Sequence, residues 1–185
     1  MPKKIRLGIL GGGGDSLIGV LHRVAAHMYD SYEIVGAVFT PKLDESLAFA
    51  RELGISTDRI YPDFDTLVAE EMKLPESERM QVCSIQTPNF LHFPMAKKLL
   101  ENGFHVICEK PMTTTYEEAK ILEETHKKAG TVFAVTHTYT GYPMVRQMRE
   151  MIKAGALGRI HKVDARYYQG WINPIIHDKE KRGSV

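Results

Sequence analysis

The chain has 185 residues, of which 43% are hydrophobic and 25% are charged, and its 24 Lys and Arg residues balance 23 Asp and Glu residues. These values are typical of a globular protein, and they exclude a disordered chain, a collagen and a coiled-coil rod. The formal net charge of +1 supplies no long-range attraction to nucleic acid or to an anionic membrane, and no apolar run approaches the roughly 18 residues of a membrane span. We therefore expect neither partner.

The two cysteines, Cys83 and Cys108, each lie inside an apolar run that is typical of a β-strand. Such positions favour buried free thiols in a reducing compartment, so we expect a cytoplasmic protein. The histidines show no spacing with Cys, Asp or Glu that is typical of a zinc or iron site, and we predict no metal.

The first predicted strand covers residues 5–10 and is followed by four glycines and a helix that begins near Leu17. This helix presents one apolar stripe at helical spacing, formed by Leu17, Val20, Leu21, Val24, Ala25 and Met28. Further strand-length apolar runs occur at residues 33–39, 82–86, 104–108 and 131–136, each followed by a segment with helical spacing. This alternation predicts an α/β fold, a doubly wound parallel sheet of the Rossmann type covered by helices on both faces.

Helix ends are marked by residues with known capping roles. Pro94 suits a first helical turn and Gly103 the position just past the helix end, while Thr115 and Glu118 form a capping box for a helix that closes at Gly130. These signals fix the two helices that flank the strand at residues 104–108.

The pattern changes after residue 136. A helix is predicted over residues 142–154, and residues 160–171 alternate irregularly, as a first strand of a different sheet would. We expect a first domain of residues 1–155 and the start of a second domain over residues 156–185. The strand would lack the sheet that pairs its edges, so we expect it to be disordered, folded back or paired with another copy of the chain, and the last of these predicts a homo-oligomer.

The glycine run occupies a position that favours a nucleotide site. A backbone that turns sharply between a strand and a helix can approach a pyrophosphate closely, while the helix N-terminus supplies positive potential. The spacing departs from G-x-G-x-x-G, because the next usable glycine is Gly19, and a wider loop is implied. A flexible turn is the alternative. The predicted cofactor-binding residues here are Gly11, Gly12, Gly13, Gly14, Ser16, Leu17 and Ile18.

The second strand runs into Thr40, Pro41 and Lys42 without the acid that usually binds the ribose hydroxyls of NAD. Thr40 and Lys42 are suited to a 2′-phosphate, which favours NADP. The alternative is that Lys42 is only a solvated loop charge. The choice between NAD and NADP stays open.

Three polar segments follow strands at their carboxyl ends, where open α/β sheets bind ligands. They are Thr87 to Asn89, Glu109 to Pro111, and residues 136–139. Lys110 follows an apolar strand by two residues, so we expect its amine to be partly desolvated and suited to acid and base chemistry. The alternative is a surface pair of Glu109 and Lys110.

Taken together, five motifs in order resemble the Gfo/Idh/MocA family of NAD(P)-dependent oxidoreductases, and Glu-Lys-Pro is the most distinctive of them. The resemblance covers residues 5–171. The motifs are Gly8 to Gly11, Gly19 with His22, Thr87 to Asn89 with His92, Glu109 to Pro111, and residues 155–160.

The resemblance implies a dehydrogenase that binds NAD or NADP and acts on a sugar, an inositol or a related polyol. It implies that Lys110 helps to move the hydroxyl proton, that Glu109 orients Lys110, that the Lys110–Pro111 bond is cis, and that Tyr139 lies near the nicotinamide or the substrate. The other cofactor-binding residues that it implies are Thr87, Pro88, Asn89, His92, Glu109, Lys110 and Pro111.

Members of this family are longer, and their second domain supplies an Asp and a His to the active site. The resemblance therefore implies a truncated chain that binds cofactor and shows little turnover by itself. A non-catalytic nucleotide-binding or sensing module is the alternative function. Lys110 discriminates between the two, because a sensor has no need of a lysine beside the nicotinamide.

Overall fold

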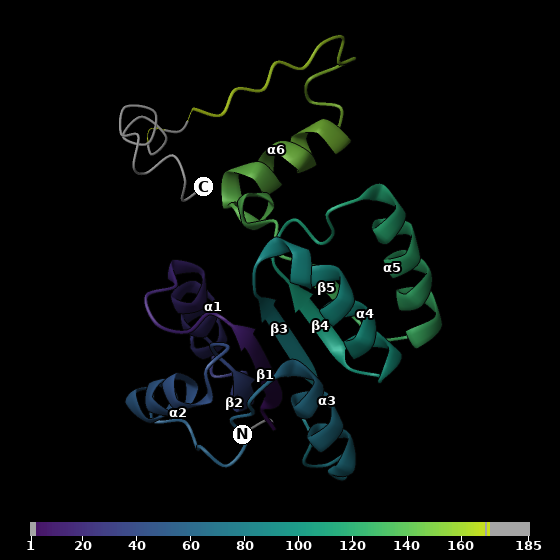
Figure 1. The fold of residues 1–185 in the computed structure, drawn as a ribbon. Helices are drawn as coiled ribbons and strands as arrows, with labels where there is room; N and C mark the ends of the chain where they lie inside the picture. Colours follow the sequence, from purple (N-terminus) through teal and green to yellow (C-terminus); the bar gives the residue numbers. More distant parts are fainter. Residues whose placement is uncertain (1–2, 169, 171–185) are drawn as a thin grey trace, which may run out of the picture. The chain divides into compact units, whose positions relative to one another are not determined.

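The computed structural model describes residues 3–168 and residue 170. These residues form a parallel sheet of five strands in the order β2-β1-β3-β4-β5 (Figure 1). The strands are β1 (Ile5–Gly11), β2 (Tyr32–Val38), β3 (Val82–Gln86), β4 (His105–Cys108) and β5 (Phe133–Val135). The helices are α1 (Leu17–His27), α2 (Leu43–Glu52), α3 (Phe64–Lys73), α4 (His92–Glu101), α5 (Tyr116–Ala129) and α6 (Pro143–Lys153), with the short 3-10 helices η1 (Asn89–Leu91) and η2 (Thr138–Gly141).

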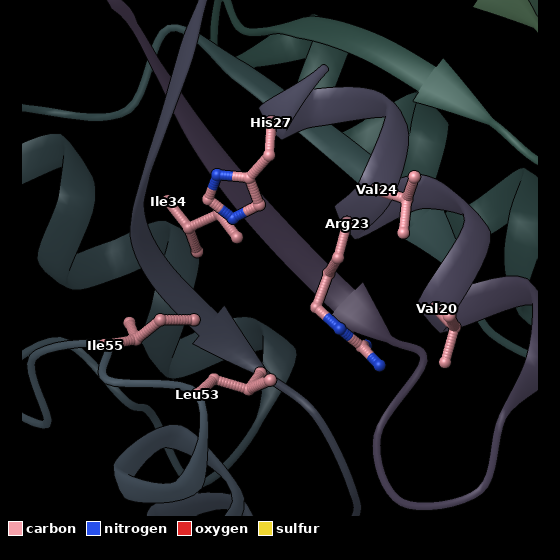
Figure 2. Close-up of a pocket in the computed structure, with 7 residues that line it drawn as sticks. All are labelled: Val20, Arg23, Val24, His27, Ile34, Leu53 and Ile55. Carbon is pink, nitrogen blue, oxygen red and sulfur yellow. The ribbon is translucent and has the colours of Figure 1, made fainter. Parts of the chain in front are cut away.

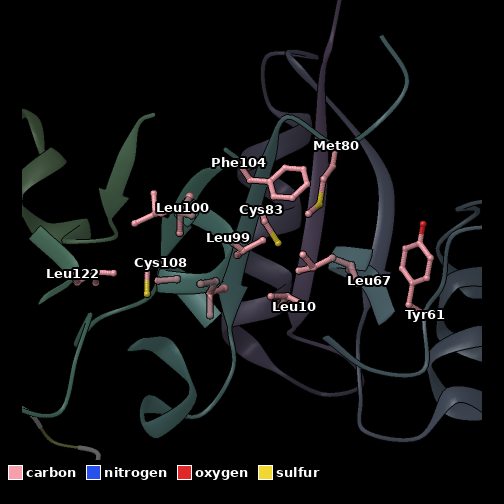
Figure 3. Packing of buried hydrophobic residues seen from close by; sticks show 14 residues of the cluster. Leu10, Tyr61, Leu67, Met80, Cys83, Leu99, Leu100, Phe104, Cys108 and Leu122 are labelled. Atoms are coloured by element: carbon pink, nitrogen blue, oxygen red, sulfur yellow. The ribbon is translucent and has the colours of Figure 1, made fainter. Parts of the chain in front are cut away.

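Helices cover both faces of the sheet, and each face has its own core. The chain runs from β1 to β2 on one side and then returns to β3, β4 and β5 on the other, and this single reversal places α1 and α2 on one face and α3, α4 and α5 on the opposite face. The larger core packs Leu67 of α3, Leu99 of α4 and Leu122 of α5 together (Figure 3). The second core contains Ala26 of α1 and Ala50 of α2. The predicted doubly wound α/β fold is confirmed.

The central strands β1 and β3 are mostly apolar because both of their faces are buried. In β1, Leu10 belongs to the larger core, whereas Leu7 and Ile9 belong to the second. Both cysteines are free and buried, as expected. The same burial explains why the apolar runs show no polar alternation in the sequence.

The capping signals are confirmed. Thr115 and Glu118 form a capping box at the start of α5, and Gly130 ends that helix in the left-handed conformation with φ of 65°. Gly103, just after α4, has φ of 80°. These positions need glycine because a side chain rarely adopts positive φ.

The apolar stripe predicted for α1 is not the face that the structure buries. Leu17 is 69% exposed and Met28 is 65% exposed, and the other large apolar side chains of the stripe are exposed as well. The buried residues of α1 are Gly19, Arg23 and Ala26, at the spacing of one helix face. The physical reason is the close approach of Gly19 to the glycine loop, which fixes how α1 is rotated about its axis.

An open groove of about 430 Å³ lies beside this exposed stripe (Figure 2). It contains none of the predicted site residues and lies between α1, β2 and the end of α2 rather than at the carboxyl ends of the strands. Its lining is mostly apolar, with Arg23 and His27 from α1. The lining residues are Val20, Arg23, Val24, His27, Ile34, Leu53 and Ile55.

The chain divides into two compact units between Thr138 and Tyr139. The second unit contains α6, and the predicted strand over residues 160–171 is wrong for its described part, because residues 160–168 form no strand. A strand needs a hydrogen-bonded neighbour, and residues 139–168 contain no other strand. Trp171 lies outside the described residues. The domain boundary at residue 155 and the homo-oligomer stay predictions.

A buried carboxylate joins the outer elements of the first unit. Glu71 of α3 is fully buried and accepts hydrogen bonds from the Arg59 guanidinium, from the Tyr61 hydroxyl at 2.8 Å and from the Met80 amide at 2.7 Å. Burial and the neighbouring carboxylate raise the pKa of Tyr61 to about 12. Every donor would lose its partner if this carboxylate were removed.

We predict that Glu71→Ala lowers the free energy of unfolding by about 3 kcal/mol, because it leaves buried hydrogen-bond donors and one guanidinium charge without a partner. The matched control is Glu70→Ala, one residue earlier on the same helix, where the carboxylate forms only an exposed pair with Lys73. The control should change the unfolding free energy by less than about 0.5 kcal/mol. Urea unfolding followed by circular dichroism measures both, and equal effects of the two variants would contradict the account.

Candidate functional site

The carboxyl ends of β1 and β3 meet where the chain reverses its direction across the sheet. Gly11 at the end of β1 pairs with Gln86 at the end of β3. Ligands of open α/β sheets bind at such a reversal, because the loops that follow the two strands diverge and leave a crevice. Two predicted segments, Gly11 to Ile18 and Thr87 to Asn89, follow these strands directly.

The glycine loop is packed so tightly that side chains are excluded from it. Gly11, Gly12 and Gly14 have positive φ values of 79°, 69° and 56°. A Cβ on Gly12 would lie 2.0 Å from the Gln86 amide oxygen, and a Cβ on Gly13 would lie 2.9 Å from the Phe39 carbonyl oxygen. The backbone itself therefore forms the surface of this loop, which is what a closely bound pyrophosphate requires.

Gly19 and Arg23 hold the loop against α1. A Cβ on Gly19 would lie 1.9 Å from the Gly12 carbonyl oxygen, so the helix and the loop touch through their backbones. The Arg23 guanidinium donates to the same carbonyl oxygen at 2.6 Å and lies 4.9 Å from the centre of the Phe49 ring. Burial lowers the pKa of Arg23. These contacts fix the loop in one shape.

The N-terminus of α1 faces the end of the loop. Ser16 caps the helix by accepting a hydrogen bond from the Gly19 amide at 3.1 Å, and the first turn carries no acidic residue. The amides of Leu17 and Ile18 have no acceptor within the helix because they belong to its first turn. Amides of this kind and the helix dipole favour an anion such as a phosphate.

Thr40 and Lys42 follow β2. The Thr40 hydroxyl donates a hydrogen bond to the Lys42 carbonyl oxygen at 2.9 Å, and the Thr40 backbone amide donates one to the Ser46 hydroxyl at 3.0 Å. The exposed Lys42 amine is paired with Glu45 at 2.7 Å. A 2′-phosphate would therefore compete with Glu45 for this amine, and the choice between the two cofactors stays open.

The turn after β3 is formed by Thr87, Pro88 and Asn89. The side chain of His92 holds this turn in place through hydrogen bonds. One ring nitrogen of His92 lies 2.8 Å from the Thr87 carbonyl oxygen, and the other lies 2.7 Å from the Pro111 carbonyl oxygen. His92 is only 1% exposed. This geometry suits a positioning role that ties two loops together, rather than the direct cofactor contact that was predicted.

Glu109 is held by groups from three different elements. Its Oε1 atom lies 2.9 Å from Nε2 of His22 and accepts a hydrogen bond from the Thr136 hydroxyl at 2.5 Å, and its Oε2 atom accepts one from the Lys110 amide at 3.2 Å. Burial alone would raise the pKa of Glu109, but the hydrogen bonds from His22 and Thr136 outweigh it and hold the pKa below its usual range. Glu109 is therefore a stably ionised carboxylate.

The hydrogen-bond chain continues into the sheet. Nδ1 of His22 lies 2.9 Å from the Ser84 hydroxyl, which accepts a hydrogen bond from the Gln86 amide nitrogen at 2.9 Å. Ser84, His22 and Glu109 are thus connected in the order of a serine hydrolase triad. Ser84 is only 2% exposed, however, so no substrate reaches its hydroxyl and the acyl-transfer chemistry of such a triad is excluded.

Lys110 and Pro111 form the turn after β4, and the bond between them is cis, as expected. Lys110 is exposed, so the expected partial desolvation of its amine is wrong for this structure. The reason is its position two residues beyond the strand, where the side chain has left the apolar layers. Across the part of the chain that the structure describes, the Lys110 amine makes no hydrogen bond or ion pair, so the alternative of a surface pair with Glu109 is wrong as well.

Tyr139 belongs to the second unit. Its hydroxyl lies 2.5 Å from that of Tyr167, a contact that raises the pKa of Tyr139, and its ring packs edge-on against Tyr142. Its position near the nicotinamide or the substrate stays a prediction. The first unit alone brings together the glycine loop, the Thr87 turn and the Lys110 turn.

Three residues of this site were not predicted from the sequence. Ser84 and Gln86 are polar residues in an otherwise apolar central strand, and Arg23 is a charge on the buried face of α1. A buried polar residue needs a partner, so the interruption of the apolar run was the signal for the first two. The rotation of α1, which places Arg23, has no such signal.

The residues present fit a dinucleotide. A cradle of backbone that a Cβ would fill lies beside a helix N-terminus, and the buried Gln86 amide oxygen, which faces this loop, has no hydrogen-bond partner in the described structure. Among the residues described, no group of three His, Cys, Asp or Glu side chains is arranged to hold a metal ion. No helix in the described part of the chain is long and apolar enough to cross a membrane.

Comparison with known proteins agrees with this geometry. The GFO_IDH_MocA family model, described as an oxidoreductase family with an NAD-binding Rossmann fold, matches residues 5–137. The uncharacterized oxidoreductase YfiI of Bacillus subtilis is 35% identical over 172 residues, which are 92% of this chain and 43% of that protein. The D-glucoside 3-dehydrogenase of Escherichia coli is 28% identical over 187 residues, covering 97% of this chain and 48% of that protein.

A solved structure of an inositol dehydrogenase homolog from Azotobacter vinelandii, complexed with NADH and myo-inositol, superposes with a TM-score of 0.82. The two sequences are 38% identical, and the superposition covers 86% of the present chain and 42% of the Azotobacter vinelandii chain. The present chain thus spans less than half the length of the relatives that it matches.

We predict that Gly19→Ala destabilises the protein, although alanine in a helix interior normally adds about 1 kcal/mol. The new Cβ cannot fit beside the Gly12 carbonyl, and we expect a net loss of about 2 kcal/mol and at least tenfold weaker NADH binding. Thermal unfolding and NADH fluorescence titration measure the two effects. Ala25→Gly, on the exposed face of α1, is the control: it should cost about 1 kcal/mol and leave NADH affinity unchanged. A gain in stability for Gly19→Ala would refute the packing argument.

Proposed function

Because the chain belongs to the Gfo/Idh/MocA oxidoreductase family, whose NAD-binding Rossmann fold it carries, we propose that it serves an NAD(P)-dependent dehydrogenase acting on a sugar, an inositol or a related polyol. The observation that carries this proposal is the position of the Lys110 turn. It follows β4, the neighbour of β3, at the same end of the sheet as the glycine loop.

The chemistry follows from what each group can do. A nicotinamide cofactor held by the glycine loop and the Thr87 turn would supply the hydride chemistry at the carbinol carbon of the substrate, in either direction. The Lys110 amine accepts the proton of the same hydroxyl group, so that a ketone or lactone results and the charges balance. A positioned acid or base of this kind contributes about 10²- to 10⁴-fold to the rate.

The remaining residues bind and orient. The glycine loop and the first turn of α1 would hold the pyrophosphate, and the turn of Thr87, Pro88 and Asn89 would contact the ribose and nicotinamide end. Glu109 would orient Lys110 through the Lys110 amide, since its carboxylate accepts that hydrogen bond. Tyr139, from the second unit, would lie near the nicotinamide or the substrate.

The substrate class is supported by two of the relatives. One is a D-glucoside 3-dehydrogenase, and another was solved with NADH and myo-inositol, so both act on or bind polyhydroxylated rings.

The test is a titration of the chain with NADH and NADPH, followed by turnover assays with myo-inositol and simple glucosides. We expect one of the two cofactors to bind, Lys110→Met to change that affinity by less than about threefold, and the same variant to lower turnover by at least about 10²-fold. Lys120→Met, on exposed α5, is the control and should change neither quantity. Failure of both cofactors to bind would overturn the proposal, and full turnover by Lys110→Met would remove the role of the lysine.

A further inference from the structure

The carboxylate of Glu109 is hydrogen-bonded to three groups, whereas the amine of the next residue, Lys110, has no hydrogen-bond partner in the described part of the chain. Three donors from α1, from the residue after β5 and from the Lys110 backbone surround the carboxylate. The Lys110 amine has no partner in the described part of the chain. Adjacent Glu and Lys side chains are long enough to form an ion pair, so the contacts that fix the Glu109 carboxylate determine whether this pair forms.

His22 has the geometry to do this. Its side chain and that of Glu109 are 15% and 13% exposed, so their contact is largely shielded from water. The Ser84 hydroxyl accepts from Gln86 and has one proton to give, which it can donate to Nδ1 of His22. Nε2 of the neutral ring then carries the proton and donates to Glu109. Ser84 and Gln86 thereby fix the tautomer that the carboxylate needs.

We propose that His22 is a positioning residue that holds the Glu109 carboxylate away from the Lys110 amine, so that the lysine stays unpaired for proton transfer. The proposal rests on the proposed function, in which this amine exchanges a proton with the substrate. It assigns Glu109 a definite arrangement: the carboxylate orients the lysine through its backbone amide and does not pair with its side chain.

The arrangement also connects the two ends of the site. His22 lies three residues after Gly19 on α1, and Gly19 touches the glycine loop. The helix that presents its N-terminus to the cofactor therefore also carries the donor that fixes Glu109. A shift of α1 along its axis would move both contacts together.

The consequence of losing His22 is specific. Glu109 would retain Thr136 and the Lys110 amide but lose the donor that fixes the direction of Oε1. The amine of the adjacent residue, Lys110, is a cation that can replace this donor. Pairing would favour the protonated amine and lower the fraction of neutral amine that can accept a proton at a given pH.

The experiment measures the reactivity of lysine amines directly. The chain is acetylated with trace acetic anhydride across a range of pH, and the extent of labelling at Lys110 is read by mass spectrometry against the exposed Lys128 as an internal reference. We expect His22→Ala to move the pH midpoint of Lys110 labelling upward by about half to one pH unit, the shift that an exposed ion pair produces.

Two further variants separate positioning from a general structural effect. The double variant His22→Ala with Glu109→Gln should return the midpoint to the wild-type value, because the neutral amide cannot pair with the amine. His22→Gln, whose amide can donate from nearly the same place, should leave the midpoint close to wild type. His126→Ala is the control histidine, since its ring, on α5, hydrogen-bonds the Thr131 carbonyl oxygen and packs near the Phe133 ring.

An unchanged midpoint in His22→Ala would overturn the proposal, because Thr136 and the amide would then suffice to hold Glu109. A midpoint that rises equally in the double variant would also overturn it, because the carboxylate would not be the cause. If His22→Ala does not fold, Ser84→Ala gives the same decision, with a smaller shift in the same direction expected because the tautomer is no longer fixed.

The labelling experiment requires neither cofactor nor turnover. Its outcome is therefore independent of the proposed function: a shifted midpoint together with full turnover by Lys110→Met would leave the positioning intact and reject the role of the lysine.

Discussion

Gly19 approaches the Gly12 carbonyl so closely that a Cβ on it would lie 1.9 Å from the oxygen. This backbone contact determines how α1 is rotated, and most of the site depends on that rotation. It places Arg23, one turn further along, beneath the loop, where its guanidinium binds the same carbonyl. It also directs His22 at Ser84 and Glu109. The large apolar side chains of α1 are exposed as a result, which shows that the fold gives up helix burial to gain the close approach.

A chain of hydrogen bonds offsets the cost of placing polar groups in a central strand of the sheet. Ser84 and Gln86 lie in β3 between strands on both sides, where an unpaired polar group costs about 1 to 3 kcal/mol. Each is satisfied by the next group of the chain that ends at Glu109. The exception is the Gln86 amide oxygen, which has no partner in the described structure and faces the glycine loop. We infer that Ser84 and Gln86 are in this strand because the site needs their hydrogen bonds, and not because they stabilise the sheet.

How much of this was predictable depends on the range of the interaction. Local signals were sufficient for the parallel sheet and for the capping box of Thr115 and Glu118, because apolar runs and caps act over a few residues. The buried face of α1 could not be predicted, since the contact that rotates the helix joins two glycines that carry no hydrophobic signal. Lys110 was expected to be partly desolvated from its distance along the chain, but the turn after β4 carries it out of the apolar layers. A strand over residues 160–168 failed because strand formation depends on a neighbour, which a local pattern does not reveal.

The central claim is that a dinucleotide binds at the carboxyl ends of β1 and β3, in contact with the glycine loop and the turns after β3 and β4. The most direct measurement is a titration of the ¹⁵N-labelled chain with NADH, or with NADPH if that cofactor binds, followed by amide chemical shifts. The account predicts that the largest shifts fall on residues 11–18, 86–89 and 109–111. Shifts concentrated instead on the groove lined by Val20, Ile34 and Ile55, with the glycine loop unchanged, would contradict it.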